Sequence, residues 1–188
     1  VLTRNRMAQA NAPAPADFKA HAYSLLTLHR PSNVDDSTIL GKLVQVLLEI
    51  GQDLPMVFPV HPRTAERLKQ AGLWQGLAES PAICLTQPLG YHDMLRLNMS
   101  ARVTLTDSGG LQEECAVLGT PCLTLRWNTE RPITLVENDG TNRLVGNDPD
   151  RIRAGYQAAL NDPPAAHRPP LWDGHAAERV LSALMDLH

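Results

Sequence analysis

Apolar residues recur along this chain in two different patterns, short continuous runs and longer segments with a helical period. The run AYSLLTL predicts a strand over 22–28, while 37–51 repeats its apolar positions every three or four residues and ends on a glycine, which predicts a capped helix. By the same criteria we expect further strands at 56–60, 82–87, 102–107, 121–126 and 142–146, a short element near 133–137, and further helices at 64–71, 93–101, 111–119, 149–160 and 176–187. Alternating strands and helices are typical of a doubly wound parallel sheet, so we expect an α/β, Rossmann-like fold.

The first 21 residues differ from the rest of the chain. They are rich in Ala, Pro and Asn, with NAPAPAD near their centre. This composition predicts a linker or N-terminal arm at 1–21, followed by one domain at 22–188 that closes with a C-terminal helix. Because the chain begins with Val1, both an upstream segment and a start at Met7 are compatible with it.

Composition places the chain among ordinary globular proteins. It has 188 residues, 43% hydrophobic content and a formal net charge of -3, which together predict one domain and give no reason to expect nucleic acid or an acidic membrane as a partner. No apolar run approaches the roughly 20 residues of a membrane span. Cys84, Cys115 and Cys122 are odd in number and lack CxxC spacing, so we expect no disulfide framework and no zinc knuckle but reduced, half-buried core thiols in a cytoplasmic protein. We also expect no metal and no cofactor.

The loops that follow the predicted strands carry most of the groups capable of chemistry. Ligands of such sheets bind outside the carboxyl ends of the strands. The loops at that edge read HRPSNVDD, HPRT, PLGYHD, DSGG, RWNTERP and GNDPD. We therefore expect the functional site at this edge.

The DSGG loop has the features of an anion site. Ser108 can cap the following helix, and the absence of β-carbons at Gly109 and Gly110 lets a ligand approach the first helical N–H groups, which attract a phosphate. Glu113 or Glu114, further along the helix, could accept hydrogen bonds from sugar hydroxyls, and a phosphate beside a diol describes a nucleotide. An ordinary capped turn explains the same residues equally well, and the sequence contains neither GxGxxG nor GxxxxGK[ST].

Basic side chains at the same edge favour the anion-site interpretation. Arginine can grip a phosphate with two N–H groups, and histidine can donate to one or transfer a proton. Two further expectations concern carboxylates: Asp107 should bond to backbone beside the cap, and Glu130 should orient Arg131. The basic residues concerned are His29, Arg30, His61 and Arg131.

Seven motifs, in order, resemble the C-terminal half of the non-hydrolysing UDP-N-acetylglucosamine 2-epimerases. They are TLHRPSNVDD, FPVHPRT, LTDSGGLQEE, LGTPCLTLR, NTERP, GTNRLVG and WDGHAAERV, and the resemblance runs from about residue 22 to residue 183. The resemblance implies the GT-B architecture, in which two Rossmann-like domains hold a UDP-sugar in the cleft between them. This chain would supply one domain, and an N-terminal Rossmann-like domain would be its partner.

The resemblance also implies a UDP site. Ser108, Gly109 and Gly110 would hold the diphosphate, and Glu114 would bind the ribose hydroxyls. Arg131 would pair with the phosphates.

Other matching positions carry an implied catalytic or regulatory role. His29 would lie by the diphosphate and the sugar as a catalytic residue, and Arg30 and His61 resemble positions that bind a second, regulatory UDP-GlcNAc in some bacterial members. Two departures are visible. Met94 stands where many members have an aromatic residue against the uracil, and Pro-Ser at 31–32 replaces the Arg-Glu that follows the same His-Arg elsewhere, which puts the regulatory behaviour in doubt.

The activity implied is that of an isomerase of cell-envelope polysaccharide biosynthesis, which interconverts UDP-GlcNAc and UDP-ManNAc by eliminating UDP and adding it back. The family's acid-base carboxylates belong to the N-terminal domain, so we expect this chain alone to be inactive. A homodimer is compatible with the sequence, and hydrolysis rather than epimerisation stays open. The alternatives are a stand-alone nucleotide-sugar binding module and a GT-B glycosyltransferase domain.

Overall fold

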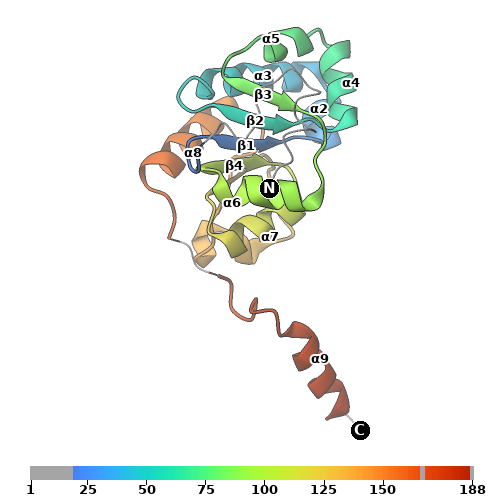
Figure 1. Ribbon diagram of the computed structural model, residues 1–188, viewed down its shortest axis with the longest axis vertical. Coiled ribbons are helices and arrows are strands. Elements are labelled where there is room, and N and C mark those ends of the chain that lie inside the picture. Colours follow the sequence, from blue (N-terminus) through green and yellow to red (C-terminus); the bar gives the residue numbers. More distant parts are fainter. Residues whose placement is uncertain (1–18, 166–167, 187–188) are drawn as a thin grey trace.

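Six parallel strands form the centre of the computed structural model, which describes residues 19–165 and 168–186 (Figure 1). Their order in the sheet is β3-β2-β1-β4-β5-β6. The strands are β1 (Ser24–Thr27), β2 (Met56–Pro59), β3 (Ile83–Thr86), β4 (Val103–Thr106), β5 (Cys122–Thr124) and β6 (Asn142–Leu144). The predicted doubly wound α/β fold is confirmed.

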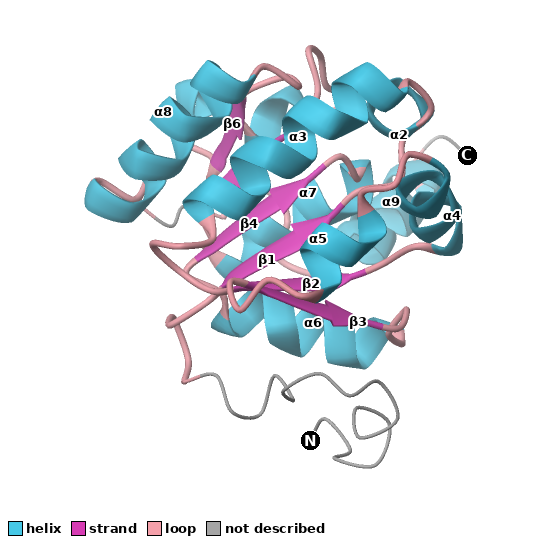
Figure 2. Ribbon diagram, turned by 90° about the horizontal axis from the view of Figure 1, so that it is seen from above, coloured by secondary structure: helices cyan, strands magenta, loops and turns pink. Residues whose placement is uncertain are grey.

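Helices cover both faces of this sheet (Figure 2). One face carries α3, α4, α5 and α8, and the other carries α6 and α7. The helices are α2 (Pro31–Val34), α3 (Ser37–Ile50), α4 (Pro62–Gln70), α5 (Trp74–Ala78), α6 (Tyr91–Ser100), α7 (Gly109–Leu118), α8 (Pro149–Asn161) and α9 (Ala176–Met185).

The central strands β1, β2 and β4 are almost wholly buried, because helices cover both faces of the sheet, whereas the edge strand β6 carries the exposed Arg143. Successive side chains point to opposite faces, so Leu26 and Phe58 join the large core beneath α3 and α8, while Leu25 and Val57 join a smaller core beneath α6. All three cysteines are buried in the core, as expected.

The strand order places the topological switch point between β1 and β4. From β1 the chain winds outward through β2 and β3, and from β4 it winds outward in the other direction through β5 and β6. Thr27 and Thr106 are direct partners at the ends of these two strands, and their hydroxyls are hydrogen-bonded. The loops that follow, 28–30 and 107–108, therefore lie at the place where ligands of such sheets bind.

Several boundaries differ from the sequence expectations. Helix α4 begins at Pro62 rather than at 64, because proline lacks the N–H that a first helical turn leaves unpaired. Helix α6 begins at Tyr91 and α7 at Gly109, each two residues earlier than predicted. The last strand ends at Leu144 instead of 146, and the short helices α2 and α5 were not predicted.

The segment near 133–137 forms two 3-10 turns, Pro132–Thr134 and Val136–Asn138. Gly140 closes this loop, and its N–H donates to the carbonyl of Leu135. A β-carbon at Gly140 would lie 2.0 Å from the carbonyl oxygen of Thr134, so only glycine fits.

The expected C-terminal helix forms as α9 and extends away from the sheet and its helices (Figure 1). Its large apolar side chains, Val180, Leu181, Leu184 and Met185, are exposed. The predicted arm at 1–21 lies almost wholly outside the described residues, so that assignment stays a prediction.

Candidate functional site

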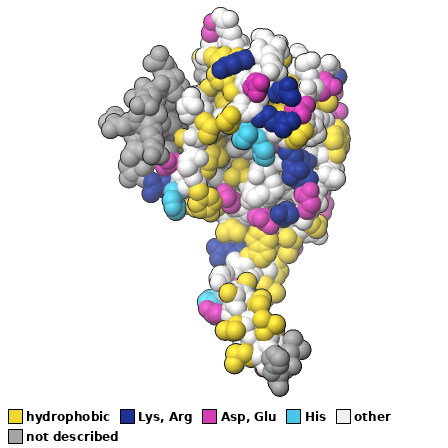
Figure 3. Space-filling model, turned by 90° about the vertical axis from the view of Figure 1, so that its right-hand side faces the viewer, with side chains coloured by type: hydrophobic (Ala, Val, Ile, Leu, Met, Phe, Trp, Pro, Cys, Tyr) yellow, Lys and Arg dark blue, Asp and Glu magenta, His cyan; other side chains and the backbone are white. Residues whose placement is uncertain are grey.

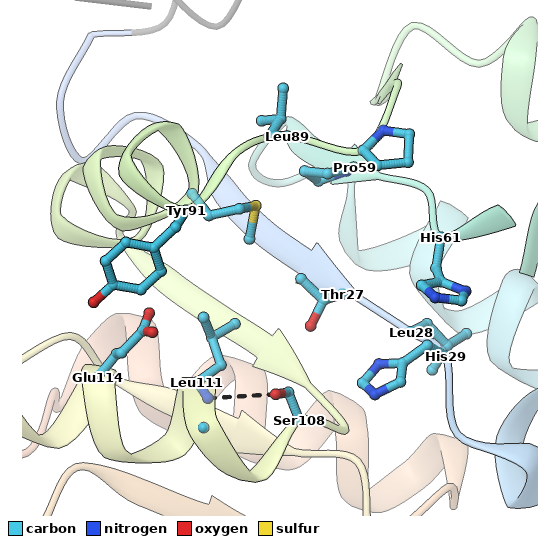
Figure 4. Close-up of a pocket in the computed structure, with 13 residues that line it drawn as sticks. Thr27, Leu28, His29, Pro59, His61, Leu89, Tyr91, Ser108, Leu111 and Glu114 are labelled. Carbon is cyan, nitrogen blue, oxygen red and sulfur yellow. Dashed lines mark hydrogen bonds between the residues drawn. The ribbon is translucent and has the colours of Figure 1, made fainter.

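A cavity of about 320 Å³ lies over the carboxyl ends of β1, β2 and β4 (Figure 4). Its walls come from the loops after these strands, the loop before α6 and the first turns of α7. Figure 3 faces this edge and shows histidine side chains with basic, acidic and hydrophobic ones around them. The lining residues are Thr27, Leu28, His29, Pro59, His61, Pro88, Leu89, Tyr91, Met94, Ser108, Gly110, Leu111 and Glu114.

Most of the predicted site residues are among these lining residues. Gly109 lies between two residues that line the cavity. Arg30 and Arg131 do not line it, although both lie at the same edge of the sheet.

The N-terminus of α7 is built as the sequence predicts. Ser108 is the N-cap, and its Oγ accepts a hydrogen bond from the N–H of Leu111 at 3.4 Å. The N–H of Ser108 donates to Thr106 Oγ1 at 3.0 Å, which holds the turn against the end of β4. The next backbone N–H groups lie at the positive end of the helix and can bind an anion.

The fold itself does not require glycine at the first two positions of α7. A β-carbon at Gly109 would be 3.9 Å from the guanidinium of Arg131, and one at Gly110 would be 4.0 Å from Ser108 Oγ, both ordinary contacts. Neither glycine has a left-handed backbone. Alanine would favour a helix more than glycine does, so the two glycines leave room for something outside the chain.

Asp107 is fully buried directly after β4 and gathers donors from the loop after β1. Its Oδ2 accepts the N–H groups of His29 and Arg30 at 2.9 and 2.8 Å, and the side-chain amide of Asn33 at 3.2 Å. Burial alone would raise the pKa of Asp107, but the hydrogen bonds from the His29 ring and from the N–H groups of Arg30 and His29 outweigh burial and lower it. Asp107 does bond to backbone, but the prediction that this backbone lies beside the cap of α7 is wrong, because the donors belong to the loop after β1.

The same carboxylate orients the imidazole of His29. The distance from His29 Nδ1 to Asp107 Oδ1 is 2.8 Å, and the His29 side chain is 40% exposed. The hydrogen bond to Asp107 raises the pKa of His29 above its ordinary value, against the opposing effect of burial. Since Nδ1 is engaged, Nε2 is the nitrogen available to a ligand, and it carries a proton in the imidazolium form.

His61 and Arg30 are each tied to the protein scaffold. His61 caps α4, and its Nδ1 accepts the N–H of Arg63 at 3.2 Å. Its ring lies 5.8 Å from that of His29, centroid to centroid. Arg30 Nε donates to the carbonyl of Asp107 at 3.0 Å. The regulatory role expected for both residues stays a prediction.

Arg131 lies over the start of α7, but a different carboxylate from the expected one pairs with it. Its Nε is 2.7 Å from Glu113 Oε1, an ion pair whose angle is too poor for a hydrogen bond. The expectation that Glu130 orients Arg131 is wrong. Glu130 pairs with the buried Arg126 through two hydrogen bonds of 2.7 and 2.8 Å, which lower the pKa of Glu130 to about 2.

The far end of the cavity is less polar. Glu114 is half-buried, and burial raises its pKa. Met94 is partly buried against the small core, and Tyr91, which is 62% exposed, lies beside Glu114 (Figure 4). Sequence reasoning missed Tyr91, although its loop PLGYHD had been placed at the correct edge.

The described residues contain neither a membrane-spanning helix nor a cluster of metal-binding side chains. No helix in them is long and apolar enough to cross a membrane. No group of three or more His, Cys, Asp or Glu side chains among them is arranged to hold a metal ion. The cytoplasmic location stays a prediction.

Fold and site together define a Rossmann-like α/β domain with an open helix N-terminus at its topological switch point, the class of domain that binds phosphorylated ligands. The chain belongs to the UDP-N-acetylglucosamine 2-epimerase family, whose model matches residues 2–185.

Curated relatives agree with this family. The chain is 40% identical over 164 residues to the UDP-N-acetylglucosamine 2-epimerase of Methanocaldococcus jannaschii, a match that covers 86% of this chain and 44% of that protein. It is 46% identical over 136 residues to the enzyme of the same name from Methanococcus maripaludis, covering 71% of this chain and 37% of the relative. The chain thus spans less than half the length of these relatives.

Solved structures give the same result. The crystal structure of the M. jannaschii UDP-GlcNAc 2-epimerase in complex with UDP-GlcNAc and UDP matches with a TM-score of 0.81 and 37% identity, over 98% of this chain and 49% of that one. The fold is therefore one half of the GT-B architecture of these epimerases.

Proposed function

We propose that this chain is the UDP-binding half of an epimerase that interconverts UDP-GlcNAc and UDP-ManNAc in the cytoplasm. The observation that carries the proposal is the open N-terminus of α7 at the switch point, where His29 and Arg131 flank two glycines that the fold does not need. Membership of the epimerase family favours this function over a glycosyltransferase or a stand-alone binding module.

In the proposed complex the diphosphate lies on the N–H groups of Gly109 and Gly110. Arg131 adds a guanidinium from one side and His29 Nε2–H donates from the other. The ribose hydroxyls reach Glu114, and the base lies against Met94 and Tyr91. This order follows the cavity from its basic end to its apolar end.

The proposed reaction begins when a base removes the proton from C2 of the sugar. The C1–O bond then breaks, its electron pair leaves with the β-phosphate of UDP, and a 2-acetamidoglucal forms. In the second half of the reaction a proton is added to C2 from the other face of the sugar, and UDP adds back at C1. His29 and the helix N–H groups stabilise the negative charge that grows on the departing diphosphate.

The residues of this cavity supply the leaving-group side of that reaction. Among its lining residues Glu114 is the carboxylate, and the proposal assigns it to the ribose. Asp107 is buried and already accepts several hydrogen bonds. The two acid-base groups at C2 therefore belong to the N-terminal domain that we propose as partner. Whether two copies of the protein form a homodimer is a separate prediction.

Proton NMR in heavy water tests this division of labour. UDP-GlcNAc incubated with the chain alone should keep its C2 proton at the rate of the protein-free control, while calorimetry should detect UDP binding. Exchange well above the control that is lost in Glu114→Gln would show that an acid-base group resides in this half. Absence of UDP binding by the folded chain would contradict the proposed site itself.

A further inference from the structure

A buried amide lies one turn inside the helix that starts at the candidate phosphate site. Gln112 is fully buried in α7. Its Nε2 donates to the carbonyl of Ser108 at 3.3 Å, and its Oε1 accepts the hydroxyl of Thr129 at 2.6 Å. Burying an amide costs desolvation that an apolar residue would avoid, even when its nitrogen and its oxygen are each hydrogen-bonded, so the partners of Gln112 indicate what the amide is for.

One of these partners, Thr129, also binds the backbone N–H of Arg131. Thr129 Oγ1, which donates to Gln112, accepts the N–H of Arg131 at 3.0 Å. One hydroxyl therefore links the helix to the loop that carries the arginine. Thr129 is only partly buried, so the link can be altered without opening the core.

The carbonyl side of Arg131 is held as well. Its carbonyl oxygen accepts the hydroxyl of Thr134 at 2.7 Å, and Thr134 Oγ1 accepts the side-chain amide of Asn142 at 2.9 Å. The same amide donates to the carbonyl of Gln112 at 3.2 Å. The hydrogen bonds thus close a ring from Gln112 through Arg131 and back to the same helical residue.

The ring fixes a backbone that has no regular structure of its own. Arg131 has φ -124° and ψ 54°, outside helix and strand, and its guanidinium lies over Gly109. An arginine side chain on a loose loop would lose much conformational entropy on binding a phosphate. A loop fixed to the helix offers the guanidinium and the helical N–H groups at a constant spacing.

We propose that Gln112 and Thr129 are positioning residues for phosphate recognition: they act through Arg131 and set its guanidinium against the N-terminus of α7. The inference rests on the proposed function, because it takes the diphosphate of UDP as the ligand. It gives a role to Gln112 and Thr129, neither of which contacts UDP in the proposed complex.

A double-mutant cycle on UDP binding tests the inference, with calorimetric dissociation constants and melting temperatures for each variant. Thr129→Val keeps the shape but removes the hydroxyl, and it should weaken UDP binding about fivefold. In an Arg131→Ala background the same change should alter the dissociation constant by less than about 1.5-fold, because the residue it acts through is gone. Thr129→Ser restores the hydroxyl and should bind within about twofold of the parent chain.

Gln112→Leu provides the second cycle, and its loss of UDP affinity should likewise disappear in the Arg131→Ala background. Equal losses in both backgrounds would overturn the inference and leave these residues as supports of the fold. An unaltered dissociation constant for Thr129→Val in the parent chain would overturn it too. A parent chain that binds no UDP would instead contradict the proposed function, so the two failures are distinguishable.

Discussion

His29 Nδ1 and Asp107 Oδ1 lie 2.8 Å apart and join the loop after β1 to the loop after β4. These two strands flank the switch point of the sheet, so the contact spans the opening in which the candidate ligand lies. The partly exposed His29 ring faces that opening. Because the buried Asp107 engages Nδ1, Nε2 is the ring nitrogen that faces the ligand. Charge and orientation at His29 are therefore set by the fold.

UDP-GlcNAc binding should weaken as pH rises through the raised pKa of His29. The imidazolium form predominates below that pKa and can donate to the diphosphate, whereas the neutral ring with Nδ1–H on Asp107 presents a lone pair instead. Calorimetry from about pH 6 to about pH 9 measures the effect. UDP-GlcNAc is the better ligand here, because it lacks the terminal phosphate of UDP, which titrates near pH 6.

His29→Gln is the matched control for this pH dependence. Its affinity should be lower than that of the parent at the acidic end and should vary little across the range. A parent chain whose affinity is constant with pH, or rises with it, would exclude the imidazolium as the donor.

Alanine at Gly110 and at Gly140 should have opposite consequences. A β-carbon at Gly110 meets only an ordinary contact, so Gly110→Ala should leave the free energy of unfolding unchanged or raise it slightly, yet weaken UDP binding roughly tenfold by blocking the helix N-terminus. Gly140→Ala places a β-carbon against the carbonyl of Thr134 and should cost about 3 kcal/mol of stability. Urea denaturation measures the change in stability, and calorimetry measures the change in UDP affinity. A Gly110→Ala chain that binds UDP as tightly as the parent would argue against close approach of the ligand to the N-terminus of α7.

Removal of the Arg131 guanidinium should weaken UDP binding by about 1.5–3 kcal/mol, the range for hydrogen bonds to charged groups. Arg131→Ala tests this by calorimetry, with circular dichroism as the check on the fold. Arg63→Ala is a suitable control, since Arg63 forms an exposed ion pair with Asp35 and does not line the cavity. Equal affinities for the Arg131→Ala and Arg63→Ala chains would remove Arg131 from the site.

Glu114→Gln should discriminate between ligands with and without a ribose. If the carboxylate accepts the ribose hydroxyls, the variant should lose about tenfold in affinity for UDP and little for inorganic pyrophosphate. Competition calorimetry measures both. A comparable loss for the two ligands would mean that Glu114 only supports α7.

Features with local causes were predictable from the sequence. The cap at Ser108 and the apolar runs of the strands depend on residues that are neighbours in sequence. These local patterns were enough to predict the sheet, most of the helices and the edge of the sheet that carries the site. The early start of α4 has a local signal too, Pro62, which was not used.

Features that depend on distant contacts were not predictable. The ring through Gln112, Thr129 and Asn142 joins residues that are far apart in sequence and meet only when β5 and β6 lie beside α7. The pairing of Glu130 with Arg126 rather than Arg131 is local in sequence, since the two residues are four positions apart, but it depends on how the irregular loop after β5 turns, and the periodicity of apolar residues does not predict that turn.

Backbone amide NMR can show whether the N-terminus of α7 binds the diphosphate of UDP. A titration of the labelled chain with UDP should shift the N–H resonances of Gly109 and Gly110 more than any others, with smaller shifts at Leu111, and uridine at the same concentration should not reproduce them. Shifts centred elsewhere, with these amides unchanged while UDP binds, would mean that the diphosphate does not lie at the N-terminus of α7.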